Sequence, residues 1–348
     1  TTDNYVNPVV NSVTATNVSN DSITVSVNAN GGTNNIQNYY YSINNGSYTS
    51  SNTNTYTFSG LSAGTNYSIR VYVKDTNGVD SNIYTINAET ENGILLADYI
   101  KGLYTSQGAN GLYYHTSSLA NSAADNSYRY AGASANVNNY VCFGSDASTC
   151  PTDNLYRIIG VFGNEVKLIK STSYGTYSWT ESNGNSWSTS SINNILNTTY
   201  YNTFNSTWQS KISTHIWKVG GMTYNNAYTA KQYYDIEVGN NSSSIIWNGK
   251  IGLMYVSDYG YTASNNYWTK ALYNYSTATS SIWLYSGLSE WTISRNSTNS
   301  YSVFDVSSGR VYHYTVTYIL EIRPCFYLTS STTYVSGSGT SSDPIRIN

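Results

Sequence analysis

Charged residues are scarce in this chain. Its 348 residues include 16 Lys and Arg and 19 Asp and Glu, or 10% of the sequence, against about 25% in an ordinary domain. The net charge of −3 and the isoelectric point near 5.6 provide no attraction to nucleic acids or anionic membranes. Solubility must come from Asn, Ser, Thr and Tyr, which suits secreted proteins. We therefore expect an extracellular protein at a cell surface, with no nucleic-acid partner.

Proline and long apolar runs are also missing. Only 4 Pro residues argue against a stalk or a mucin-like segment. No stretch approaches the roughly 18 apolar residues of a membrane-spanning helix. The chain begins at Thr1 without a signal peptide. We therefore expect a processed product whose membrane or wall anchor lies outside this sequence.

The chain has only three cysteines. Cys142 and Cys150 are separated by seven residues of a polar loop, which makes a small disulfide-closed loop plausible in an extracellular protein. Two free thiols are the alternative. Cys325 lies in the apolar run CFYL and is expected to be a buried thiol.

Aromatic residues, in contrast, are abundant. They make up 15% of the sequence, with 38 Tyr and 8 Trp, whereas disordered chains contain few aromatics and carry high net charge. The length fits two folded domains, or three. We therefore expect a globular protein with at least one large core.

Residues 1–90 alternate between apolar and polar positions with a period of two. Segments such as SITVSVNA and NYSIRVYVKD read as half-buried strands, separated by turns such as NANGG and DTNG. Leu61 precedes Tyr67 at the start of a strong strand, in the pattern of a tyrosine corner. The stretch resembles a fibronectin type III domain, an all-β sandwich, but has Ile23 and Val25 where that family has a strand-B Trp. The resemblance implies a spacer or adhesion module.

Residues 91–348 carry a mixed pattern after the linker ETENG. Helical spacing is seen over residues 94–104, 190–204 and 207–212. Two apolar strands joined by Gly163-Asn164 predict a hairpin, and from Ile216 onward the pattern favours strands. A few helices beside many strands predict an α+β domain.

Two short motifs specify this fold further. YSGLSEWTISRN (285–296) and IRPCFYL (322–328) resemble two segments of the formylglycine-generating, sulfatase-modifying domains, which have a C-type-lectin-like fold. The matching residues are Gly287, Glu290, Trp291, Thr292 and Arg323. We expect Trp291 to anchor the core, and Glu290 and Arg323 to form a buried ion pair as part of the framework.

Catalytic chemistry has little support. The sulfatase-modifying enzymes use a closely spaced Cys pair before the terminal strand, and residues 303–321 contain no Cys. No metalloprotease, serine-hydrolase, P-loop or dinucleotide motif is present, nor a triplet of calcium-dependent lectins. The carboxylates of Glu165, Asp258 and Glu290 could form a glycosidase pair only in space. The three His residues, His115, His215 and His313, are not spaced as metal ligands. We therefore expect no catalytic residues, metal or cofactor.

The segment at about 297–324 resembles the variable region of lectin-fold proteins that are diversified by retroelements. In that family, framework residues alternate with positions reachable by adenine mutation of Asn codons. The framework positions here are Val303, Phe304, Val306, Gly309, Val311, Val316, Ile322, Arg323 and Pro324. The candidate variable positions are Tyr301, Ser302, Asp305, Ser307, Ser308, Arg310, Tyr312, His313, Tyr314, Thr315, Thr317, Tyr318, Ile319 and Leu320. Glu321 does not fit the codon rule, and an ordinary aromatic edge of a Tyr-rich protein is the alternative.

These observations predict a bacterial surface or pilus-associated adhesin that binds a protein or glycan ligand on another cell or surface. All the candidate variable positions except Ser302 are expected to contact the ligand. Tyr312, His313, Tyr314 and Tyr318 should form one exposed patch, because Tyr supplies a large amphipathic contact area at low entropy cost, while Arg310, Asp305 and His313 would set polar specificity. Two rival classes remain open: a self-assembling subunit of a filament or surface layer, and a glycan-active enzyme.

Overall fold

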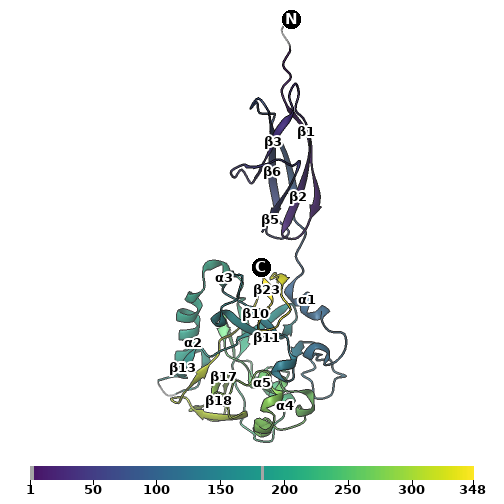
Figure 1. The fold of residues 1–348 in the computed structure, drawn as a ribbon. Helices are drawn as coiled ribbons and strands as arrows, with labels where there is room; N and C mark the ends of the chain where they lie inside the picture. Colours follow the sequence, from purple (N-terminus) through teal and green to yellow (C-terminus); the bar gives the residue numbers. More distant parts are fainter. Residues whose placement is uncertain (1–3, 182–183) are drawn as a thin grey trace. The chain divides into compact units, whose positions relative to one another are not determined.

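A computed structural model describes residues 4–181 and 184–348 (Figure 1). The chain forms two compact units, which divide between Gly93 and Ile94. This division lies three residues after the boundary expected at residue 90. No helix in the described ranges is long and apolar enough to cross a membrane.

The first unit is a β-sandwich, as the alternating pattern predicts. One sheet has the strand order β1-β2-β5 and the other has the order β4-β3-β6-β7. The strands are β1 (Val9–Val18), β2 (Ser22–Asn30), β3 (Ile36–Ile43), β4 (Thr49–Ser51), β5 (Thr55–Ser59), β6 (Asn66–Asp75) and β7 (Tyr84–Glu89).

The core of this sandwich follows directly from the period of two. Alternate residues of β2 and β6, among them Ile23, Val25, Ile69 and Val71, are fully buried. The phenol oxygen of Tyr67 accepts a hydrogen bond from the backbone N–H of Ser62 at 2.8 Å, so the predicted tyrosine corner is present. The fibronectin-like expectation for this unit is therefore confirmed at the level of fold.

The larger unit combines several sheets with short helices (Figure 1). The helices are α1 (Leu96–Gly102), α2 (Ser191–Ile195), α3 (Ser206–Ser210), α4 (Ala230–Glu237) and α5 (Val256–Tyr261). The strands are β8 (Leu112–Tyr114), β9 (Tyr128–Tyr130), β10 (Tyr140–Cys142), β11 (Leu155–Phe162), β12 (Glu165–Lys170), β13 (Gly175–Ser178), β14 (His215–Lys218), β15 (Ile246–Gly249), β16 (Ile251–Gly252), β17 (Glu290–Arg295), β18 (Ser302–Ser307), β19 (Arg310–Thr315), β20 (Ile319–Ile322), β21 (Cys325–Tyr327), β22 (Tyr334–Ser336) and β23 (Arg346–Ile347).

Two sheets organise this unit. The first has the order β16-β21-β12-β11-β9-β8, and β10 also pairs with β11. Its β11–β12 hairpin turns at Gly163-Asn164, as predicted. The second sheet has the order β13-β20-β17-β18-β19 and places the β18–β19 hairpin at one edge.

The pattern after Ile216 favours strands, and two helices interrupt it. The first is α4, which begins with a capping box between Thr229 and Gln232. The second is α5, in which every residue from Val256 to Tyr261 is buried. A short helix that is buried on all sides shows no amphipathic period, so its apolar run resembles a buried strand.

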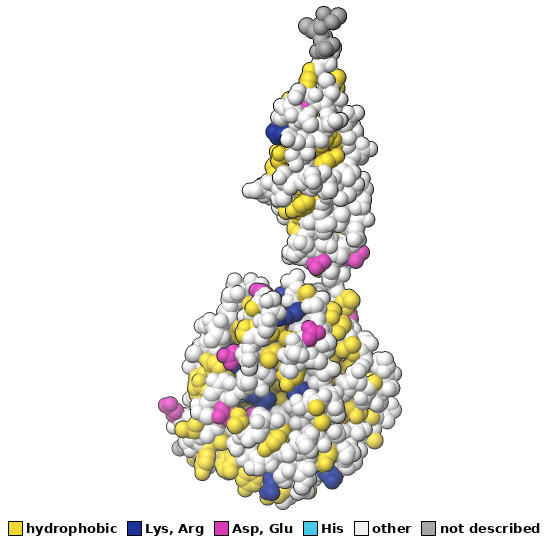
Figure 2. Space-filling model, viewed as in Figure 1, with side chains coloured by type: hydrophobic (Ala, Val, Ile, Leu, Met, Phe, Trp, Pro, Cys, Tyr) yellow, Lys and Arg dark blue, Asp and Glu magenta, His cyan; other side chains and the backbone are white. Residues whose placement is uncertain are grey.

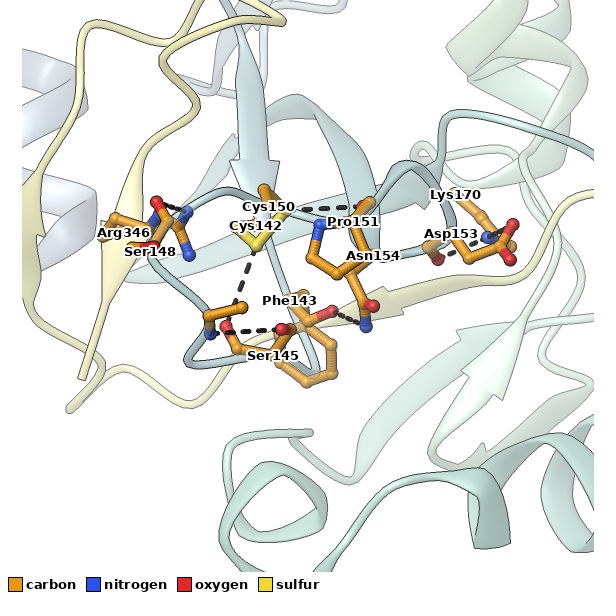
Figure 3. Close-up of a disulfide and its surroundings, with 11 residues drawn as sticks. Cys142, Phe143, Ser145, Ser148, Cys150, Pro151, Asp153, Asn154, Lys170 and Arg346 are labelled. Carbon is orange, nitrogen blue, oxygen red and sulfur yellow. Dashed lines mark hydrogen bonds and ion pairs between the residues drawn. A yellow bond between two sulfur atoms is a disulfide. The ribbon is translucent and has the colours of Figure 1, made fainter.

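The predicted disulfide between Cys142 and Cys150 is confirmed, with the two Cα atoms 5.8 Å apart (Figure 3). Arg346 of β23 donates a hydrogen bond to the carbonyl of Ser148 at 2.9 Å. The disulfide-closed loop is thus tied to the C-terminal strand. The third cysteine, Cys325, is free and buried.

Trp291 on β17 is a buried anchor of the second sheet. Its side chain is only 1% exposed. Its indole N–H donates a hydrogen bond to the carbonyl of Tyr177 at 3.0 Å, and its ring contacts that of Trp179 edge-on. The ring therefore joins β17 to β13 at the far edge of the same sheet.

We predict that Trp291→Ala lowers the free energy of unfolding by about 3–5 kcal/mol, because it leaves a cavity and an unpaired carbonyl. Denaturant unfolding followed by far-UV circular dichroism measures this change. Trp291→Phe, which keeps most of the ring volume, should cost clearly less. An equally stable Ala variant that has lost only ligand binding would show that this ring belongs to the binding surface.

Candidate ligand-binding site

The β18–β19 hairpin is held in a fixed conformation by its turn. Ser308 and Gly309 form the two-residue connection and have φ values of 50° and 77°, the pattern of a type I′ hairpin turn. A Cβ atom at position 309 would lie 2.4 Å from Cγ2 of Thr279. Tyr259 also donates a hydrogen bond to the Gly309 carbonyl at 3.0 Å. Glycine is therefore required at the tip of the hairpin.

The apolar framework of the segment points into the core. The framework side chains are nearly inaccessible to solvent, and the most exposed of them, Val306, reaches only 3%. The buried residues are Val303, Phe304, Val306, Val311, Val316 and Ile322. They fix the hairpin on the sheet, so the remaining side chains are presented from a rigid base.

The aromatic side chains of β19 and the following turn lie outward. Tyr312 is 39% exposed and Tyr318 is 55% exposed, while His313 and Tyr314 are half-buried. The ring centroids of Tyr312 and Tyr314 are 6.0 Å apart, and those of Tyr314 and Tyr318 are 5.0 Å apart and stacked. These tyrosines are therefore in contact with one another on an accessible face.

The remaining accessible positions of the segment are mostly polar. Their side chains are exposed or half-buried, and Tyr301 and Ile319 are 53% and 66% exposed. The other accessible positions are Ser307, Ser308, Arg310, Thr315 and Thr317.

The expectation that Asp305 and Leu320 contact a ligand is wrong. Asp305 is fully buried, because β18 is an interior strand and the register places Asp305 between Trp291 of β17 and Tyr312 of β19. Leu320 is 9% exposed and lies opposite Tyr177 of β13. Ser302, a candidate variable position at the start of β18, is also buried.

Tyr273 and Tyr224 also belong to the aromatic face, although no sequence pattern indicated them. Tyr273 belongs to the 3-10 helix η8 (Leu272–Thr277), and its ring centroid lies 6.3 Å from that of Tyr312. Tyr224 contacts both Tyr312, at 5.5 Å, and His313, at 4.7 Å. We name Tyr273, Tyr312, Tyr314 and Tyr318 the tyrosine row. Only the fold brings its first member to the hairpin.

Two hollows open beside this row. One has a volume of about 360 Å³ and is lined by Tyr273, Ser307, Ser308, Arg310, Tyr312 and Tyr314. The other has a volume of about 500 Å³ and is lined by Lys270, Ala271, Tyr273, Asn274, Ser276, Thr277 and Arg310. Both volumes fall in the range of small-ligand sites.

The predicted framework pair lies behind this surface. Nε of Arg323 is 2.9 Å from the carboxylate of Glu290, and the guanidinium also donates to the Leu284 carbonyl at 2.6 Å. Both side chains are buried. The pair thus connects β17 to the segment between β20 and β21.

The carboxylates that could have formed a catalytic pair each have a cationic or imidazole partner instead. Glu165 bonds to His215 at 2.9 Å, and Asp258 to Lys167 at 2.6 Å. Asp258 also lines a cavity of about 160 Å³ together with Asp125. Burial acts to raise the pKa of Asp125, but the charge of Arg129 and hydrogen bonds from Ser127 lower it overall. Asp125 is therefore ill suited to act as a general acid.

Metal-binding side chains are not clustered in the described part of the chain. Within the described ranges, no group of three His, Cys, Asp or Glu side chains is placed to hold a metal ion. His115 is buried in the core and His313 lies on the aromatic face. Figure 2 shows few charged side chains on the visible face of the larger unit.

Comparison with known proteins finds similarity among solved structures. No protein-family profile and no curated protein matches the sequence. The chain is similar to the PKD1 domain of Vibrio anguillarum Epp, with 20% identity over 25% of this chain and 98% of that one and a TM-score of 0.22. It is also similar to the PKD1 domain of the Vibrio cholerae metalloprotease PrtV, with 17% identity over 25% of this chain and 100% of that one and a TM-score of 0.22. A human fourth fibronectin type III domain is similar too, with 22% identity over 26% of this chain and 85% of that one and a TM-score of 0.22.

Asp305 is an unsatisfied buried carboxylate directly behind the tyrosine row. Among the described residues, neither of its carboxylate oxygens has a hydrogen-bond partner. Burial raises the pKa of Asp305 from its ordinary value of 3.8 to about 8. Asp305 is therefore mostly protonated and uncharged at neutral pH.

This shift predicts a pH-dependent stability. The folded state keeps a proton that the unfolded state releases, so the contribution of Asp305 to stability is fully present below about pH 4 and is lost as the pH rises to about 8. In the Asp305→Asn variant, the loss of unfolding free energy between about pH 4 and pH 8 should be smaller than in the wild type by on the order of 3–5 kcal/mol. Chemical denaturation at the two pH values measures it. Other buried carboxylates, such as Glu237, are present in both the wild type and the variant, so their effects on stability cancel in the comparison. Parallel pH profiles for the two proteins would contradict the assignment.

Proposed function

We propose that this chain is an extracellular, non-catalytic binding protein that recognises a macromolecular ligand through the tyrosine row and its flanking polar side chains. The observation that carries the proposal is the continuous set of ring contacts from Tyr273 through Tyr312 and Tyr314 to Tyr318 on an accessible face. The β-sandwich of the first unit would serve as a spacer that presents the larger unit.

The row has the physical properties of a recognition surface. Tyr side chains have few rotatable bonds and offer both an apolar ring and a hydroxyl group, so they lose little entropy on binding. The hairpin that carries Tyr312 and Tyr314 is already fixed by its Gly309 turn and its buried Val residues. Such preorganisation reduces the cost of association.

An extracellular location is supported by three features. The chain has a disulfide, which forms and persists in oxidising compartments. It has little charge, and it contains a fibronectin-like sandwich, a type found in many cell-surface proteins. We therefore propose a cell-surface adhesin on a bacterium, anchored by elements outside this chain.

A C-type-lectin-like assignment of the larger unit would explain why the two sequence motifs are in contact. Glu290 and Trp291 belong to the first motif and Arg323 to the second, and the pair across them is buried. The variable-region resemblance is supported by exposure. The framework positions are buried, while Asp305, Leu320 and Ser302 alone among the candidate variable positions are buried with them. We propose that diversification, where it operates, acts on the accessible positions.

Sequencing this gene from sibling cells tests that part of the proposal. Substitutions should be confined to accessible positions of residues 301–319, such as Ser308 and Arg310, and should spare Gly309 and Val311. The buried positions tolerate few side chains because the core is close-packed. Uniform variation along residues 94–348 would contradict diversification and leave the binding proposal unchanged.

Self-assembly through the tyrosine row is a rival use of the same surface. A filament or surface-layer subunit would bury these rings against another copy of the chain. Analytical ultracentrifugation of the wild type and of the Tyr312→Ala/Tyr314→Ala variant over a range of concentrations distinguishes the two uses, because assembly through the row gives a mass that rises with concentration and falls when the rings are removed.

The central test replaces two members of the row. Tyr312→Ala with Tyr314→Ala should reduce affinity for the ligand-bearing surface by about 2–4 kcal/mol, because both rings lie at the centre of the contact. The melting temperature should change little. Binding is measured on printed glycan and protein arrays, and melting by calorimetry.

The matched control is Tyr40→Ala with Tyr72→Ala. These two rings also stack on a sheet surface, with centroids 4.6 Å apart, but they belong to the first unit. The control should bind normally. A hairpin variant that binds as well as wild type, or one that loses most of its stability, would refute the proposed function.

A further inference from the structure

The two hollows beside the tyrosine row share Arg310 and Tyr273. The guanidinium carbon of Arg310 lies over the ring of Tyr273, 5.3 Å from its centroid, so a cation–π contact orients the side chain. Arg310 therefore stands between the hollows, and its planar group faces both of them.

Among the described residues, this guanidinium has no anionic partner. In the part of the chain that the structure describes, no ion pair and no side-chain hydrogen bond involves Arg310. Lys270 lines the second hollow and lies over the ring of Tyr267 at 5.2 Å. The linings of both hollows thus hold two cations and no carboxylate, in a protein with little charge of either sign.

The buried carboxylate behind the row does not offset these cations at neutral pH. Asp305 lies on the same face of β18 as Ser307, two residues before it. Because burial raises the pKa of Asp305 to about 8, the group is mostly neutral. The local potential is therefore positive and favours an anion.

The remaining lining groups indicate what kind of molecule bears that anion. The side chains of Ser307, Ser308, Ser276 and Thr277 provide hydroxyl groups, and Asn274 provides an amide. The one aliphatic side chain in the two linings is Ala271, so the hollows offer hydrogen-bonding groups and aromatic rings rather than aliphatic contact area. A dense set of hydroxyl and amide groups beside Tyr rings suits a polyhydroxylated ligand.

We infer that the hollows beside the tyrosine row bind an acidic glycan, with a uronic acid carboxylate against the Arg310 guanidinium and sugar rings packed on Tyr312 and Tyr314. The planar guanidinium matches a carboxylate through two parallel hydrogen bonds. This inference rests on the proposed function, since it assigns a ligand class to the same surface.

The test uses the full chain and pairs of oligosaccharides that differ only in charge. Oligomers of galacturonate, guluronate and glucuronate are compared with their methyl esters, which keep the sugar and lose the carboxylate charge. Binding is measured by isothermal titration calorimetry for the wild type, Arg310→Ala, Arg310→Lys and the Tyr312→Ala/Tyr314→Ala variant.

A matched control for the arginine is Arg70→Ala in the first unit. Arg70 also lies over a tyrosine ring, 5.8 Å from the centroid of Tyr48. This variant should bind every acid as the wild type does, so any general effect of losing one positive charge is separated from the role of Arg310.

We expect at least one acid to bind about tenfold or more tightly than its ester, a preference that falls as salt is added. Arg310→Ala should abolish that preference, and Arg310→Lys should retain only part of it. Equal binding of acid and ester by the wild type, or a preference that survives Arg310→Ala, would overturn the inference. So would binding to none of the oligomers.

These outcomes separate the inference from the proposed function. If no oligomer binds but the arrays reveal a protein ligand that is lost in the Tyr312→Ala/Tyr314→Ala variant, the glycan assignment fails and the recognition surface stands. If the double tyrosine variant binds every partner as the wild type does, the proposed function itself fails.

Discussion

The guanidinium of Arg323 lies between the carboxylate of Glu290 and the carbonyl of Leu284, and the organisation of the larger unit depends on this buried contact. Glu290 begins β17, the interior strand on which the β18–β19 hairpin is paired. Removing either partner would leave a charge buried without compensation, which costs far more than the pair contributes when intact. The contact therefore acts chiefly on the geometry of the sheet, since it fixes where β17 lies relative to β20 and β21.

In this chain, tyrosine supplies polar interactions that charged residues supply in other proteins. Inside the core, tyrosine hydroxyls satisfy backbone carbonyls, as Tyr259 does at Gly309 and Tyr275 at Gly260. On the surface, the same residue supplies contact area without the hydration cost of an ionised group. A protein with so few ions can therefore present a broad amphipathic face, and an isolated cation such as Arg310 gains importance because few other charges compete with it.

In the β18–β19 hairpin, the residues that stabilise the fold and the residues that could contact a ligand are different ones and lie close together in the sequence. Val303, Val306 and Val311 are buried, and Gly309 sets the turn. Neighbouring positions such as Ser308 and Arg310 are exposed. Substitution at an exposed position leaves the packed contacts intact, so the surface can change without loss of the fold.

The sequence by itself determined the features that depend on local spacing. Alternation with a period of two identified the first unit's sandwich, and the short interval between Cys142 and Cys150 identified the disulfide. The spacing of small apolar residues likewise separated framework positions such as Val311 from outward ones such as Tyr312. Each of these depends on neighbours in the chain, which the sequence displays directly.

The tertiary structure alone decided which surfaces are covered and which distant residues meet. Alternation indicates which side chains share a face of a strand, but the neighbouring strands decide whether those side chains are exposed to solvent. Asp305 is buried because β17 and β19 flank it. The helical state of α5 was hidden because its burial on every side removes the amphipathic period. Tyr273 lies beside Arg310 only because η8 packs along β19. Contacts between segments far apart in sequence carry no local period, so only the folded chain reveals them.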